Sequence, residues 1–273
     1  WPDQDKGLDK FYPTNTLVTG PDIIFFWVAR MIISGYEFMG ELPFKNVYFT
    51  SILRDDTGKK LSKSLGNSPD PFDLFDEYGT DAVRFGVMLM APQGLDVLFS
   101  KERLEIGRNF MNKIWNASRF IQMNIPVKAN LKFEIDYEKL ELPERWILSR
   151  LTKMVEDYND HLDRFRFNEA AKSLYDFTWN DFCDWYIEIS KIRFSSGDAN
   201  DVNIARSIVL ECLRSILILL HPFSPFISEE LWSFFKEEDS SDLIVSQWKK
   251  TGALRDISAE SKMNILKNII SDI

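Results

Sequence analysis

Strand-forming residues occur in two short runs, both near the start of the chain. Residues 16–19 (T-L-V-T) and 46–53 (N-V-Y-F-T-S-I-L) are rich in β-branched and aromatic side chains. The turn G-P-D follows the first run, and the apolar segment 23–34 then predicts a buried helix with Asp22 at its N-cap. Alternating strands and helices indicate a parallel α/β sheet, but two strands are too few to complete one. We therefore predict an incomplete sheet whose other strands come from outside this chain.

After residue 100 the pattern changes to long helices. Apolar side chains recur at helical spacing in 100–124, in a segment that starts at Pro143, and in 168–194, 201–220 and 225–235. The expected buried face of the first helix consists of Leu104, Met111, Ile114, Trp115 and Ile121. Short turns join the later segments, so we predict an antiparallel helical bundle.

Two shorter helices lie between the strands and the long helices. The first begins at 70–71 (D-P) and ends at Gly79, and the pair T-D at 80–81 caps a second helix that runs to about Met90. The polar, weakly patterned segment 127–142 marks a further boundary. We predict a mainly helical, multidomain chain with an α/β segment in 1–79, a connecting region in 80–142 and a helical domain in 143–273.

Composition excludes several classes of protein. With 273 residues and 45% hydrophobic side chains, the chain can bury real cores, and it shows neither a signal peptide nor a membrane span. Cys183 and Cys212 are too few for a zinc site or a disulfide framework, so we expect reduced thiols in a cytosolic protein without a structural metal.

The net charge of −9 argues against nucleic-acid binding by bulk electrostatics, so any RNA contact has to be local. The candidate basic stretches are residues 59–63, the series Arg103, Arg108, Lys113 and Arg119, and the pair Arg164 and Arg166.

The segment 55–67 (D-D-T-G-K-K-L-S-K-S-L-G-N) is where we expect the chemistry. Three lysines and two serines lie within residues 59–64, and Gly58 and Gly66 bracket them. Ammonium groups on long stems can follow phosphate oxygens whose charge changes during a reaction, and hydroxyl and loop N–H groups donate to the same oxygens. A lysine cluster taken alone is more often a solvated basic turn. The composition indicates a mobile cationic loop that is a candidate phosphate site.

The string K-L-S-K-S at 60–64 resembles the K-M-S-K-S signature of the class I aminoacyl-tRNA synthetases, with leucine in place of methionine. Three further strings also resemble this family, at 12–32, 77–85 and 221–232, and the first of them is similar to the valyl-tRNA synthetases in particular. The family's H-I-G-H motif is absent, as are the first half of its nucleotide fold, its editing domain and its C-terminal coiled coil. We therefore expect a C-terminal piece of a longer enzyme, inactive by itself.

The resemblance implies a fold and an activity. Residues 1–79 would be the second part of a Rossmann-like catalytic domain, 80–142 a stem-contact region and 143–273 a helical anticodon-binding domain. The parent enzyme would be a cytoplasmic monomer. It would activate valine with ATP, bound as its Mg²⁺ complex, to valyl-adenylate, and transfer the valyl group to tRNA(Val).

The resemblance also implies roles for residues before the lysine loop. Thr19, Gly20 and Asp22 would border the ATP ribose and the amino acid, with Gly20 and Asp22 in the ATP site and Thr19 in the amino-acid pocket. Trp27 would form a wall of that pocket, and the backbone of residues 50–53 would lie near adenine.

Within the loop, Lys60 and Lys63 are the catalytic candidates, because they would lie against the ATP phosphates. Lys63 would stabilise the charge that develops as pyrophosphate leaves, and Ser62 and Ser64 would complete the ATP site. Two alternatives stay open at this point. The helical part could be a non-catalytic RNA-binding or scaffolding module, or the parent could be a synthetase for isoleucine or leucine; the string I-I-F-F-W after Asp22 favours the valine enzyme.

Overall fold

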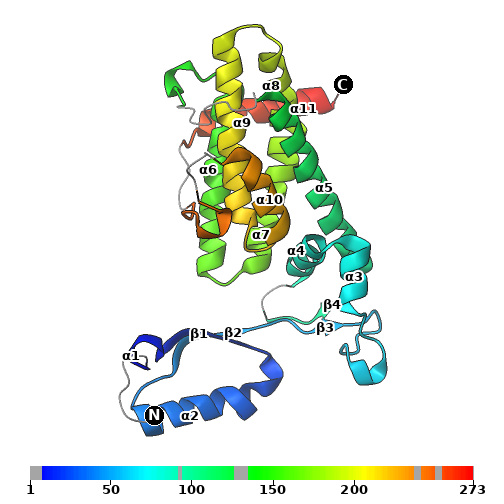
Figure 1. The fold of residues 1–273 in the computed structure, drawn as a ribbon, viewed down its shortest axis with the longest axis vertical. Coiled ribbons are helices and arrows are strands. Elements are labelled where there is room, and N and C mark those ends of the chain that lie inside the picture. Colours follow the sequence, from blue (N-terminus) through cyan, green and yellow to red (C-terminus); the bar gives the residue numbers. More distant parts are fainter. Residues whose placement is uncertain (1–7, 92–93, 126–134, 237–240, 250–253, 273) are drawn as a thin grey trace. The chain divides into compact units, whose positions relative to one another are not determined.

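The structure, a computed structural model, divides into two compact units (Figure 1). The residues that it describes are 8–91, 94–125, 135–236, 241–249 and 254–272. Unit 1 consists of Trp1–Ser68 and Met90–Phe99, and unit 2 of Pro69–Leu89 and Ser100–Ile273. Part of the expected polar connection, residues 127–134, lies outside the described residues. The prediction of a mainly helical chain with a partial α/β segment is confirmed, whereas the functional bounds 1–79, 80–142 and 143–273 stay a prediction.

Unit 1 contains two small parallel sheets. In one, β1 (Thr14–Thr19) pairs with β2 (Phe44–Phe49), and in the other β3 (Leu53–Arg54) pairs with β4 (Val97–Leu98). The predicted run 46–53 is thus divided between two strands. The strand β4 was not predicted, because two residues are too short a run to show a pattern. A short helix, α1 (Leu8–Phe11), precedes β1.

The helical crossover between β1 and β2 differs from the prediction in two ways. It starts as a 3₁₀ turn, Pro21–Ile23, whose N-cap is Gly20 rather than Asp22, and continues through a π-helical turn into α2 (Ala29–Met39). Its large side chains are exposed rather than buried, by 82% at Phe25 and 58% at Trp27. A helix that is apolar on all sides needs cover on all sides. Two strands offer too little surface to provide it.

Unit 2 is built from helices of very different lengths. Two short helices and one long helix come first: α3 (Pro71–Tyr78), α4 (Thr80–Met90) and α5 (Lys101–Asn124). The remaining helices are α6 (Leu142–Asp163), α7 (Phe167–Asp176), α8 (Ile187–Phe194), α9 (Ala199–Leu220), α10 (Pro225–Phe235) and α11 (Ile257–Ser271). A π-helical stretch joins α7 to α8, so the segment predicted as one helix from 168 to about 194 is continuous but irregular. The helix α11 was not predicted.

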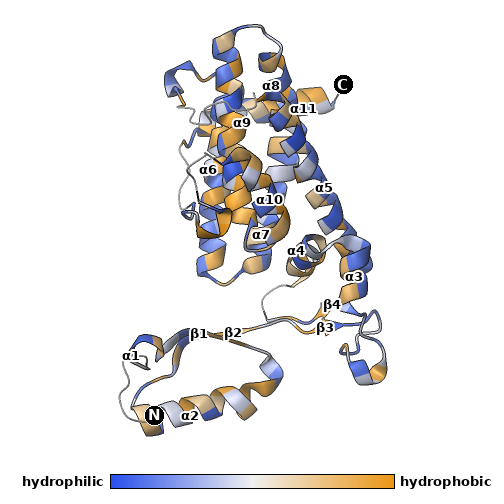
Figure 2. Ribbon diagram, viewed as in Figure 1, coloured by the Kyte–Doolittle hydropathy of each residue, from blue (hydrophilic) through white to orange (hydrophobic). Residues whose placement is uncertain are grey.

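The core of unit 2 lies around α9, which is hydrophobic along most of its length (Figure 2). Trp146 of α6 is 1% exposed, and Tyr158 is fully buried with its hydroxyl donating to the carbonyl of Leu219 at 2.6 Å. On α5 the expected face is buried except for Trp115, which is 38% exposed. Trp115 directly follows the buried Ile114 in the sequence, and a helix turns by about 100° per residue, so it points past the edge of the buried face.

The helices α4 and α5 cross with their backbones in contact. A Cβ atom on Gly107 of α5 would lie 2.2 Å from the carbonyl oxygen of Ala82, and one on Gly86 of α4 would lie 2.8 Å from that of Arg103. Neither distance is possible for carbon against oxygen. Glycine at both positions therefore fixes how closely α4 approaches α5, because no other residue leaves room for the partner backbone.

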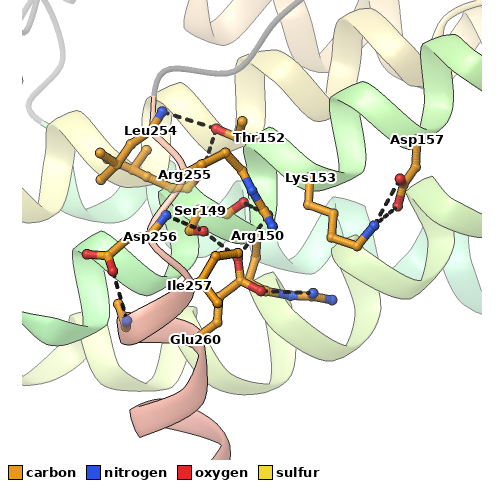
Figure 3. A network of polar contacts seen from close by, with 12 residues as sticks. Ser149, Arg150, Thr152, Lys153, Asp157, Leu254, Arg255, Asp256, Ile257 and Glu260 are labelled. Carbon is orange, nitrogen blue, oxygen red and sulfur yellow. Dashed lines mark hydrogen bonds and ion pairs between the residues drawn. The ribbon is translucent and has the colours of Figure 1, made fainter.

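The helix α11 is fastened to α6 by polar groups (Figure 3). The hydroxyl of Ser149 donates to the carboxylate of Glu260 and accepts from the N–H of Asp256 at 2.8 Å, while Arg255 donates to Glu260 at 2.8 Å. The ammonium of Lys267 lies 4.8 Å from the centre of the Trp146 ring. The buried residues of α11 are Ala259 and Met263, so polar contacts add to a small apolar contact.

Asp81 caps α10 rather than its own helix. Its carboxylate accepts the backbone N–H groups of Phe226 at 3.4 Å and Ile227 at 2.6 Å, in the first turn of α10. The N-cap residue of α10, Ser224, makes no side-chain cap bond of its own. The prediction that Asp81 caps the helix beginning at Thr80 is therefore wrong, because its side chain meets the orphan donors of a helix more than 140 residues away.

Replacing Asp81 by alanine should lower the free energy of unfolding of the chain by about 1 to 2 kcal/mol, the usual cost of removing a helix cap. The Asp81→Asn variant keeps an acceptor oxygen and should lose less. Urea denaturation followed by circular dichroism measures both. Asp76→Ala, which removes an exposed carboxylate from α3, is the control. Equal stability of Asp81→Ala and the control would show that α10 does not depend on this cap.

Candidate functional site

The carboxyl ends of β1 and β2 form one edge of the first sheet. Thr19 lies opposite Phe49, and the N–H of Thr50 donates to the carbonyl of Thr19 at 2.9 Å, which extends the ladder past both strands. Gly20 and Asp22 follow directly in the turn that starts the 3₁₀ segment. In open α/β sheets, ligands bind at this edge of the sheet. The predicted residues Thr19, Gly20 and Asp22 therefore lie where a ligand site is expected.

The lysine loop leaves β3 and folds back on it. An isolated antiparallel bridge joins Arg54 to Lys60, and the N–H of Leu61 donates to the carbonyl of Leu53 at 3.2 Å. The guanidinium of Arg54 also donates to Asp96 at 2.6 Å, beside β4. The lysine loop is thus attached to the second sheet through Arg54, at the end of β3.

An ion pair joins the lysine loop to the turn after β1. The ammonium of Lys60 lies 2.7 Å from Oδ2 of Asp22, and these residues are 38 positions apart in the sequence. Both side chains are more than half exposed, at 57% and 55%, so the pair is worth about 1 kcal/mol or less. The ion pair places the two segments in contact. Because it is weak, Lys60 can exchange Asp22 for a ligand.

The second lysine of the motif, Lys63, has no carboxylate partner among the residues that the structure describes. Lys63 begins a 3₁₀ turn, Lys63–Leu65, and its exposed ammonium makes no ion pair with any residue that the structure describes. Ser62 and Ser64 flank Lys63 in the sequence, and their hydroxyl oxygens lie 2.7 Å from one another. Positive charge and hydroxyl donors are therefore offered together at one exposed turn.

Trp27 is placed differently from the other predicted site residues. It lies on the π-helical turn after Asp22 and is 58% exposed. Within the described part of the chain, no hydrogen bond or ion pair joins it to the lysine loop. The structure thus brings Thr19, Gly20, Asp22 and Lys60 together, and it leaves Trp27 on the neighbouring turn.

Asp55 and Asn67 determine the shape of the lysine loop, and neither was predicted as a site residue. Asp55 and Asn67 stand at the two ends of the segment and hydrogen-bond to one another at 2.7 Å. The pattern D-D-T-G is typical of a turn in which an aspartate accepts from the backbone ahead of it, and this signal could have identified Asp55. Nothing local identifies Asn67, because its partners lie 5 to 12 residues away.

The basic series on α5 is largely engaged by other side chains. Lys113 pairs with Asp184 and lies 4.9 Å from the ring centre of Trp179, and Arg108 stands over the ring of Tyr78. The remaining members, Arg103 and Arg119, are exposed and have no carboxylate partner among the described residues.

Next to Arg119, aromatic and basic side chains meet. Phe120 lies edge to face with Phe194 of α8 at 5.9 Å, and the ammonium of Lys191 is 5.6 Å from the Phe120 ring. In the other predicted basic pair Arg164 is bound to Asp160 at 2.8 Å, whereas Arg166 is exposed and makes no ion pair with a described residue. At the end of α5 an arginine without an ion pair among the described residues therefore directly precedes an aromatic residue, and the same holds for Arg166, which lies between Phe165 and Phe167.

The described residues offer neither a metal site nor a membrane-spanning helix. They contain no cluster of three or more His, Cys, Asp or Glu side chains that could hold a metal ion. None of the helices described is long and apolar enough to cross a membrane. The cysteines, Cys183 and Cys212, are both buried and unbridged, and burial raises the pKa of the Cys183 thiol to about 12.

Two known families match different parts of the chain, and the first match includes residues 69–89, which belong to unit 2 in the fold. Residues 1–100 match the family of tRNA synthetases class I for isoleucine, leucine, methionine and valine, and residues 144–273 match the anticodon-binding domain of tRNA ligase. Among solved structures, methionyl-tRNA synthetase of Mycobacterium tuberculosis in complex with methionyl-adenylate is similar, with a TM-score of 0.71 and 19% identity over 94% of this chain and 52% of that one. A leucyl-tRNA synthetase complex from Agrobacterium radiobacter K84 gives a TM-score of 0.67 and 21% identity over 94% of this chain and 30% of the other. At these identities the likeness shows the fold.

Curated relatives are more similar in sequence. The valine–tRNA ligase of Fusobacterium nucleatum is 48% identical over 280 residues, and that of Pseudothermotoga lettingae is 45% identical over 274. Each match covers 100% of this chain and 31% of the relative, so the chain spans about a third of the length of these ligases. The chain belongs to the valine–tRNA ligases within the class I tRNA synthetases, and it corresponds to the last part of the catalytic domain together with the anticodon-binding domain.

Proposed function

We propose that this chain works in a valine–tRNA ligase that activates valine with ATP and transfers the valyl group to tRNA(Val). The observation that carries the proposal is the meeting of Lys60 with Asp22 at the carboxyl edge of β1 and β2. Two motifs far apart in the sequence then face one substrate. The first step is attack of the valine carboxylate on the α-phosphate, with pyrophosphate as the leaving group.

The lysine loop supplies the charge that this step needs. ATP enters as its Mg²⁺ complex, so the metal ion arrives with the substrate. Lys63, which has no carboxylate partner in the described chain, neutralises the negative charge that grows on the leaving pyrophosphate. Lys60 exchanges Asp22 for a phosphate oxygen at little cost, and Ser62 and Ser64 donate to neighbouring oxygens.

The turn after β1 positions the other reactant. Thr19 and Gly20 present backbone groups at the sheet edge, beside the ribose of ATP and the amino acid, and Asp22 borders the same space. Trp27 forms one wall of the valine pocket, and the backbone of residues 50–53 lies near adenine. Holding the carboxylate and the α-phosphate in line accounts for much of the catalysis of such a transfer.

Lys63→Ala in the full-length ligase should lower kcat for adenylate formation by about 100-fold or more, as expected for loss of one transition-state donor. The Michaelis constant for valine should stay nearly unchanged, because the charge acts mainly in the transition state. Valine-dependent exchange of pyrophosphate into ATP measures both constants. Lys59→Ala removes the same charge from an exposed neighbouring lysine and is the control. If both variants lose rate equally, the loop contributes only bulk charge.

We infer that unit 2 binds the anticodon arm of tRNA(Val) at the end of α5. The net charge of −9 argues against binding by bulk electrostatics, so we place the contact on a restricted strip. The guanidinium of Arg119 has no carboxylate partner among the described residues and can bind phosphate. The ring of Phe120, beside which Lys191 pairs with Glu188, offers a surface for an unstacked base. The match of residues 144–273 to anticodon-binding domains supports RNA binding by the helical part of the chain, and Lys191 lies within that match, whereas Arg119 and Phe120 precede it.

Arg119→Ala should raise the Michaelis constant for tRNA in the aminoacylation reaction and leave valine activation unchanged. The slope of log affinity against log salt should become less steep by about 1, because one phosphate contact is lost. Lys153→Ala removes a lysine that Asp157 already neutralises and serves as control. An unchanged tRNA affinity in Arg119→Ala would contradict a site at the end of α5 and would indicate that tRNA binds elsewhere on unit 2.

A further inference from the structure

The side chain of Asn67 contacts three groups of the lysine loop at once. Its Nδ2 donates to Oδ2 of Asp55 at 2.7 Å and to the carbonyl of Lys60 at 3.3 Å. Its Oδ1 accepts the N–H of Ser62 at 2.9 Å. The chain can turn back to make these contacts because Gly66 adopts a left-handed conformation with φ 66°. The carboxamide of Asn67, at one end of the motif, therefore hydrogen-bonds to Asp55 at the other end and to Lys60 and Ser62 in the middle.

Asp55, the partner of Asn67, holds the other arm of the loop. Its Oδ1 accepts the N–H of Thr57 at 3.0 Å, the hydroxyl of Thr57 at 2.7 Å and the N–H of Lys59 at 2.8 Å. The hydrogen bond from Asn67 and those from Thr57 and Lys59 hold the pKa of Asp55 at about 2, below its ordinary value of 3.8. At neutral pH the carboxylate is ionised and accepts from every one of these donors.

The contacts of Asn67 fix the backbone on both sides of Leu61. The carbonyl of Lys60 and the N–H of Ser62 are held by the same side chain, so the direction in which the Lys60 side chain leaves the loop is set. Ser62 is the N-cap residue of the turn that Lys63 begins, so the position of Lys63 is set as well. A side chain that only stabilised the loop base would not need contacts at these two peptide groups.

We propose that Asn67 is a positioning residue that holds Lys60 and Lys63 in the geometry needed for transfer at phosphorus. This inference rests on the function proposed above. The position requires a donor toward Asp55 and an acceptor toward Ser62 at the same time, which the carboxamide supplies. Alanine would remove all of these contacts. Aspartate would keep the acceptor and place a second carboxylate against the first.

The first experiment compares Asn67→Ala with the parent in the full-length ligase by valine-dependent pyrophosphate exchange. We expect kcat to fall by between about 10-fold and 100-fold, the usual effect of a small misplacement of catalytic groups, while the Michaelis constant for valine is unchanged. Asp56→Asn changes an exposed neighbouring aspartate and should match the parent. A kcat for Asn67→Ala equal to that of the parent would overturn the inference.

The second experiment uses charge to separate positioning from general loss of structure. In Asn67→Asp two carboxylates would face each other, so one of them would bind a proton with a raised pKa and become a donor again. Relative to the parent, the activity of Asn67→Asp should therefore rise as the pH is lowered, and that of Asn67→Ala should not. Parallel pH profiles for the two variants would contradict the proposal.

The third experiment exchanges the two partners. The double variant Asp55→Asn with Asn67→Asp restores one amide and one carboxylate, so it should have a higher kcat than Asn67→Asp alone. Losses that simply add would show that the two residues act independently, which overturns the inference. Inactivity of the parent ligase toward valine would instead refute the proposed function.

A measurement that does not depend on catalysis distinguishes failure of this inference from failure of the proposed function. Carboxyl NMR titration of the present chain should find Asp55 titrating at about 2 in the parent and closer to 3.8 in Asn67→Ala. An unchanged titration of Asp55 would show that Asn67 does not bind it, whatever the activity of the ligase.

Discussion

The parallel pairing of β1 with β2 is the constraint on which the candidate site depends. Because parallel strands end at the same edge of a sheet, the turn after Thr19 and the segment after Phe49 leave the sheet side by side. That segment reaches β3, and the loop from β3 returns Lys60 to Asp22. A shift of the register by one residue would turn every side chain of the strand to the other face, and the two motifs would no longer meet.

Sequence reasoning succeeded where the structural signal is local. The bounds of α10 follow from Pro225 at its first turn, and those of α3 from the cap at Asp70 and the glycine at Gly79. The lysine motif can be recognised because its residues are consecutive, and its role in catalysis stays a prediction. The burial predicted for Phe25 and its neighbours was wrong because burial depends on what surrounds a helix, which the helix's own sequence does not contain.

The residues that sequence reasoning missed act across long separations. Asp81 resembles a cap for its own helix, yet its acceptor oxygens serve α10. Asn67 reads as the last residue of a turn, and its role is visible only once the loop is folded onto Asp55. A similar case is Arg193 of α8, which donates to the nearly buried Glu144 of α6 at 2.8 Å. In each case a polar side chain satisfies a group that chain order places far away, and propensity carries no information about such a partner.

The polar attachment of α11 has a consequence for how the helical unit comes apart. Burial of apolar surface produces the heat-capacity change of unfolding, whereas exposed ion pairs are weakened by dissolved salt. The core around α9 belongs to the first kind, whereas partly exposed ion pairs join α6 to the start of α11, where Arg145 pairs with Asp256 and Arg150 lies 3.7 Å from Glu260. Dissolved salt therefore weakens the attachment of α11 more than it weakens the core beneath it.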